Sequence, residues 1–139
     1  MEISDIKRRV VETIERARRR AGERRTRVDE ATREYDAFLN RIAIPVFKQV
    51  ANVLRAEGHM FTVFTPGGSV RLMSDRATED YVELGLDTSG DEPAVSGHAS
   101  RSRGRRVVES EEPLGPPASL TEEDVLAFVL KSIEPLVER

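Results

Sequence analysis

An apolar residue recurs at alternating steps of four and three along the first 42 residues of the chain. The twelve positions of this seam, ten of them apolar, are Ile3, Lys7, Val10, Ile14, Ala17, Ala21, Arg24, Val28, Ala31, Tyr35, Phe38 and Ile42. Such heptad spacing is typical of a long α-helix that packs against another helix. A helix of this length spans roughly 60 Å, more than the core of a small domain covers. We therefore expect part of the seam to meet another helix.

We predict that most of this seam is a helix-pairing interface. The predicted interface residues are Val10, Ile14, Ala17, Ala21, Val28, Ala31, Tyr35, Phe38 and Ile42. The middle of the seam should be its weakest stretch, because the alanines bury little area and Gly22 costs about 1 kcal/mol of helix propensity.

Arginines border the middle of the seam. In heptad lettering, Arg18 and Arg25 occupy e positions, whereas Arg20 and Arg27 occupy g positions. A parallel homodimer in register would set Arg20 against Arg25 of its mate, and such like-charge pairs disfavour that arrangement. A staggered, antiparallel or acidic partner is favoured instead. The other interpretations are a solvated face supported by nearby glutamates, and contacts to nucleic-acid phosphates.

Pro45 interrupts the helical pattern. The residue before a proline is pushed away from helical angles, so we expect a kink or a break near this position. A second helix over residues 45–57 follows, and Gly58 is suited to end it. Residues 1–44 would then form a projecting, coiled-coil-like helix, and residues 45–139 an α+β body.

The apolar period changes to two after the second helix. This alternation, broken by turn residues, predicts an antiparallel meander of four or five strands over about residues 60–111. A proline-containing connector over residues 112–120 leads to a last helix over residues 121–138. Thr121 and Asp124 have the spacing of a capping box at the start of that helix. The apolar face of this helix is wide, which is typical of a helix that is buried on more than one side.

One turn of the predicted sheet resembles a catalytic signature. The apolar run before Asp87 is similar to that of aspartic proteases, but both Thr88 and Ser89 precede Gly90, so the motif is one residue too long. The chain has no second copy of it, and paired catalytic carboxylates would need a homodimer. A polar hairpin turn is the favoured interpretation.

The other candidate motifs also favour structural roles. The segment from Pro66 to Ser69 joins two predicted strands and lacks the lysine of a phosphate loop, so we expect a plain turn. His59 and His98 have no neighbouring carboxylates at metal-ligand spacing. We predict no catalytic residue, metal or cofactor, and we identify no small-molecule substrate.

A second basic cluster lies where the last two predicted strands meet. Arginines on a hairpin can hold phosphates or carboxylates, so these residues are candidate anion or nucleic-acid contacts. The nearby Glu109, Glu111 and Glu112 offer intramolecular partners, which would leave an ordinary charged loop. The cluster consists of Arg101, Arg103, Arg105 and Arg106.

Composition narrows the class of protein. The chain has no cysteine, which excludes disulfides and thiolate chemistry. It contains neither the apolar core of a signal peptide nor a membrane-length apolar run, so a cytoplasmic location is the default expectation. Its net charge of −3 argues mildly against a dedicated nucleic-acid binder.

These patterns favour a non-enzymatic protein–protein interaction module of the assembly, adaptor or chaperone-like kind. It would oligomerise, or bind an acidic or helical partner, through the N-terminal helix. In size, acidity and α+β class it is similar to small bacterial secretion chaperones, a likeness at the level of fold class. The alternative is an accessory nucleic-acid-binding protein that uses the arginine clusters at residues 18–27 and 101–106.

Overall fold

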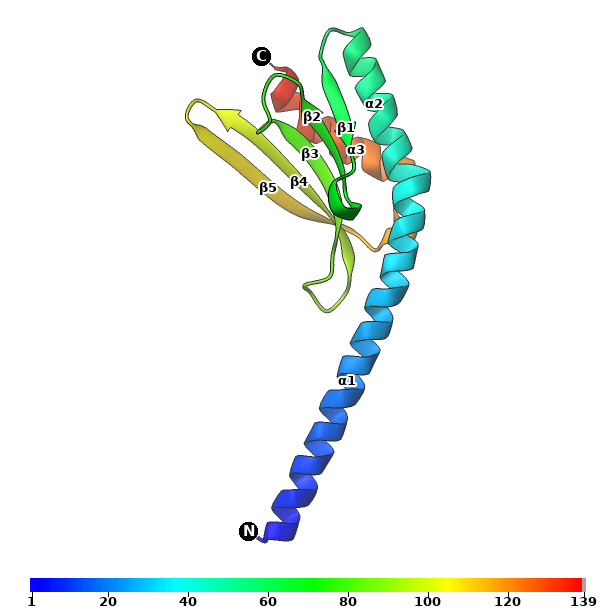
Figure 1. Ribbon diagram of the computed structural model, residues 1–139, viewed down its shortest axis with the longest axis vertical. Helices are drawn as coiled ribbons and strands as arrows, with labels where there is room; N and C mark the ends of the chain where they lie inside the picture. The colour runs from blue at the N-terminus through cyan, green and yellow to red at the C-terminus, as the bar shows by residue number, and fades with distance from the viewer. Residues whose placement is uncertain (139) are drawn as a thin grey trace.

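The heptad-patterned segment forms one long helix that continues into a second helix without a break. The computed structural model describes residues 1–138. Helix α1 spans Ile3–Phe38, the π-helical segment η1 spans Leu39–Ala43, and α2 spans Ile44–Ala56. The N–H of Ile44 donates to the carbonyl of Leu39, which widens this turn by one residue. Pro45 follows at once and has no N–H with which to continue the helical hydrogen bonds. The predicted kink near Pro45 is therefore a π-helical turn, and the helix axis changes direction there (Figure 1).

Five strands form an antiparallel meander, as the alternating pattern predicts. Their order in the sheet is β1-β2-β3-β4-β5. The strands are β1 (Phe61–Phe64), β2 (Val70–Ser74), β3 (Tyr81–Asp87), β4 (Ala94–Arg103) and β5 (Arg106–Gly115). Val63, Leu72 and Val82 lie opposite one another on adjacent strands. This register places the apolar residues of successive strands on one face.

The last hairpin is longer than the sequence indicates. Strand β5 continues to Gly115, so the predicted connector over residues 112–120 starts too early. Pro113 lies within β5 and pairs with Ser96 of β4. Strand β5 is an edge strand, where a proline can face away from the ladder and cost no hydrogen bond. Gly104, with φ of 64°, supplies the tight turn between β4 and β5.

Helix α3 (Glu122–Val137) begins with the predicted capping box. The N–H of Asp124 donates to the Thr121 hydroxyl oxygen, and the N–H of Thr121 donates to the Asp124 carboxylate. The helix then crosses the sheet so closely that Phe128 lies directly over Gly97 of β4. A Cβ atom added at Gly97 would overlap the Phe128 ring. Only glycine fits at this point of the sheet.

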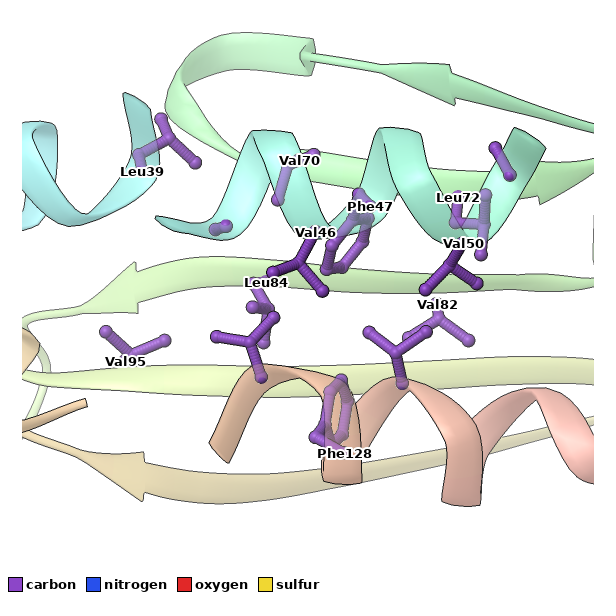
Figure 2. Packing of buried hydrophobic residues seen from close by; sticks show 14 of the residues in the cluster. Leu39, Val46, Phe47, Val50, Val70, Leu72, Val82, Leu84, Val95 and Phe128 are labelled. Atoms are coloured by element: carbon purple, nitrogen blue, oxygen red, sulfur yellow. The ribbon is translucent and has the colours of Figure 1, made fainter. Parts of the chain in front are cut away.

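One apolar core lies between the sheet and the two helices that cover it. Figure 2 shows side chains of α2 and α3 meeting those of the strands, with Phe47 and Phe128 at the two sides of the cluster. Phe47, Leu72 and Leu84 are among its fully buried members. The fold class predicted from the sequence, including the C-terminal helix on the sheet, is confirmed. Within residues 1–138, no helix has the length and apolar character needed to cross a membrane.

Candidate interaction surface of the projecting helix

The N-terminal part of α1 projects beyond the body (Figure 1). From Ile3 to Arg27 every residue is exposed except Asp5 and Gly22, which are half-buried. The N-terminal end nevertheless carries large aliphatic side chains that are 42–85% exposed. We call these five residues the tip stripe: Ile3, Ile6, Val10, Val11 and Ile14. Their spacing places them along one side of the helix.

The predicted interface divides into two parts with different surroundings. Ala31, Tyr35 and Phe38, which we call the root residues, are at most 7% exposed and belong to the buried interior of the chain. The other predicted interface residues lie outside it or at its border: Val10, Ile14, Ala17 and Ala21 are exposed, whereas Val28 and Ile42 are half-buried. The surface available to another molecule therefore ends near Val28.

Tyr35 anchors the root of the helix to the sheet. Its hydroxyl donates a 2.6 Å hydrogen bond to the carbonyl of Gly68, in the turn η2 (Pro66–Gly68) between β1 and β2. Burial, with smaller contributions from Asp36 and Glu83, raises the pKa of Tyr35 to about 12. The turn predicted at Pro66 to Ser69 thus has a structural role, because it accepts this bond from α1.

The arginines of α1 lie on the projecting part of the helix. Arg18, Arg20, Arg25 and Arg27 are all exposed. Among the residues the structure describes, the only side-chain ion pair within α1 joins Arg8 to Asp5, at 3.4 Å. The glutamates of the helix therefore do not form close pairs with these arginines, and the positive charge of this segment stays available to an acidic surface.

The second arginine cluster lies on the hairpin formed by β4 and β5. Arg101 is half-buried on β4, and Arg103, Arg105 and Arg106 are exposed around the β4–β5 turn. Their neighbouring glutamates have other partners: Glu109 and Glu111 flank His98 at 3.5 and 3.9 Å, and Glu112 pairs with Lys131.

The two arginine clusters lie far apart. Asp91, in the loop before β4, lines the same surface hollow as Arg24 and Val28 of α1. The ten residues of β4 then lead away from that loop to the second cluster, a distance of about 30 Å. A nucleic acid would have to span this distance to contact both clusters.

Of the residues considered for catalysis, Asp87 lies in a turn and His98 lies on the sheet. The Asp87 carboxylate is fully exposed and accepts hydrogen bonds from the backbone N–H and the hydroxyl of Ser89, at 2.9 and 2.6 Å. These bonds lower the pKa of Asp87 and form the polar turn that the sequence predicts. His98 stacks on Tyr81 on the sheet face away from α3. Within residues 1–138 no group of three His, Cys, Asp or Glu side chains is placed to hold a metal ion.

Sequence reasoning missed two apolar parts of the surface. Ile6 and Val11 flank the seam at heptad positions g and e, where their apolar character was the available signal. An apolar groove between α2 and α3 was also missed as a surface, although the wide apolar face of the last helix pointed to more than one contact. Val53 of α2 and Leu130 of α3 are exposed beside this groove.

Comparison of the chain with protein-family models, with curated proteins and with solved structures finds no match.

Proposed function

We propose that this chain is a non-enzymatic protein–protein interaction module that associates through the tip stripe of α1. The observation that carries the proposal is the exposed aliphatic stripe on a helix that projects from a body with its own closed core. Covering an isoleucine or valine of this kind contributes roughly 1.5–3 kcal/mol per fully buried side chain. Because the tip residues are 42–85% exposed in the free chain, several of them must be covered together to offset the translational and rotational freedom lost on association.

The lack of packing along the projecting helix supports the same proposal. Helices in proteins take most of their stability from the packing of an apolar face. The projecting part of α1 has no such packing within residues 1–138. A helical partner, or a second copy of the chain, would supply it. The unpaired arginines from Arg18 to Arg27 favour an acidic partner surface or a pairing that avoids bringing them together.

Sedimentation equilibrium of purified protein tests this proposal by self-association. The wild-type chain should increase in mean mass with concentration, and Val10→Asp should raise the dissociation constant by at least about tenfold. Val107→Asp is a matched control, because Val107 on β5 is 51% exposed and Val10 is 52% exposed. The control should associate like the wild type.

Either of two results would overturn the proposal that the chain self-associates through the tip stripe. One is a monomer at every concentration up to the millimolar range. The other is an equal loss of association in Val10→Asp and Val107→Asp, because that would indicate a general effect of surface charge. Circular dichroism should confirm that both variants keep their helical content.

A further inference from the structure

The outer surface of the helical layer contains an apolar groove. It lies between α2 and α3 and has a volume of about 510 Å³. Val53 on one wall is 63% exposed and Leu130 on the other is 50% exposed, although both helices turn their opposite sides to the sheet. We call this feature the α2–α3 groove. Its main apolar lining residues are Val46, Val50, Val53, Leu126, Leu130 and Ile133.

The tip stripe of α1 has the residue pattern that fits such a groove. An amphipathic helix that binds in a groove between helices does so with anchors at spacings of three and four residues. Ile3, Ile6, Val10 and Ile14 follow one another at spacings of three, four and four. The two surfaces are also similar in character, since each is a row of aliphatic side chains with charged residues at its edges.

The charges at these edges are complementary. Glu122 and Glu123, in the first turn of α3, line the groove. Lys7 lies in the seam between Ile3 and Val10, and Arg9 lines the same hollow as Ile6 and Val10. A helix tip seated in the groove would therefore bring lysine and arginine toward two glutamates.

The groove cannot receive the tip of its own chain. Ile6 and Val50 are 44 residues apart on a helix that continues from α1 into α2, which corresponds to about 65 Å. Ile6 lies near the start of α1 and Val50 lies in α2, so they are toward opposite ends of that helix. A helix tip that fills the groove must therefore come from another molecule, and a second copy of the chain has such a tip.

We propose that the α2–α3 groove binds the tip stripe of a second copy, so that two chains associate antiparallel through two reciprocal helix-in-groove contacts. This inference rests on the proposed function and names the surface that the tip meets. Two-fold symmetry closes such a pair, whereas a single contact repeated in one direction would build open chains.

Complementation between two inactive variants tests the inference. Ile14→Asp disables the tip and leaves the groove intact, whereas Leu130→Asp disables the groove and leaves the tip intact. Each variant alone should sediment as a monomer. An equimolar mixture should form a heterodimer, because the intact tip of one chain can enter the intact groove of the other. Its dissociation constant should exceed that of the wild type, since one contact of two remains. Val107→Asp is again the control and should dimerise alone.

The possible results distinguish this inference from the proposed function. If Leu130→Asp dimerises like the wild type while Ile14→Asp is monomeric, the tip pairs elsewhere, so the groove inference fails and the proposed function stands. If both variants are monomeric but their mixture stays monomeric, reciprocal tip-in-groove binding is contradicted. If Ile14→Asp itself dimerises with wild-type affinity, both proposals fail. Thermal unfolding of each variant should match the wild-type monomer, because Ile14 and Leu130 are 44% and 50% exposed.

Discussion

The two ends of α1 carry the same heptad pattern but lie in different surroundings. The root residues Ala31, Tyr35 and Phe38 are buried where α1 meets the turn around Pro117 and the turn at Gly68, whereas Val10 and Ile14 face solvent. An apolar seam therefore predicts that a helix packs against something, but it does not indicate what. Here the chain itself covers the root of the seam, and we propose that a second molecule covers the tip.

Truncation of a root side chain should have the largest effect. Phe38→Ala should lower the free energy of unfolding by about 3–5 kcal/mol, because the ring is 4% exposed and leaves a cavity. Ile14→Ala should change it by less than about 0.5 kcal/mol when urea unfolding is measured on dilute monomer. Equal losses in the two variants would show that the tip is packed in the monomer. Phe38 would be a natural choice for a pairing test from its heptad position, but substitution there tests folding.

Adding a methyl group at a glycine should lower the stability of the body but raise that of the projecting helix. Gly97→Ala should destabilise the fold by about 1–3 kcal/mol, because the added Cβ meets the Phe128 ring. Gly85→Ala is the control in the sheet, since its nearest neighbour, the Ser69 Cβ, is 3.7 Å away. Urea midpoints that are the same for the two variants would contradict the close contact between α3 and β4.

The Tyr35 bond to the turn at Gly68 should contribute a smaller amount. Tyr35→Phe should cost about 0.5–1.5 kcal/mol at neutral pH. Folding raises the pKa of this phenol from 10.0 to about 12, so the folded state favours the protonated form. That contribution is complete below pH 10 and is lost as pH rises toward 12. The stability difference between wild type and Tyr35→Phe should therefore shrink over this window. A difference that stays constant from pH 9 to 12 would contradict the assignment.

The smallest effect should have the opposite sign. Gly22→Ala should stabilise the projecting helix by up to about 1 kcal/mol, because nothing lies closer to the added Cβ than the Arg25 guanidinium at 3.8 Å. Amide hydrogen exchange around residues 15–30 should slow, whereas the unfolding midpoint of the body should not move. Faster exchange in this segment would show that Gly22 is needed for close helix approach.

Local patterns predicted most of the fold. The capping box at Thr121 and Asp124, the alternation that gives the strands and the turn at Asp87 each depend on residues within a few positions of one another. Strand β5 extends beyond its prediction because its edge position tolerates Pro113, and edge position is a property of the whole sheet.

The interaction surface was less predictable because it also depends on how the whole chain packs. The spacing that places Tyr35 on the seam also places Ala17 there, and only tertiary packing decides that one is buried and the other exposed. The α2–α3 groove combines Val53 and Leu130, which are far apart in sequence, so no local pattern contains it.

The most direct test of the central claim is hydrogen exchange along α1 at increasing protein concentration. Root residues around Ala31 to Phe38 should be protected already in dilute solution, where the chain is a monomer. Residues 3–14 should exchange rapidly there and gain protection as association proceeds. Rapid exchange of residues 3–14 at every concentration, while the root stays protected, would contradict the claim that the tip of α1 is a self-association surface.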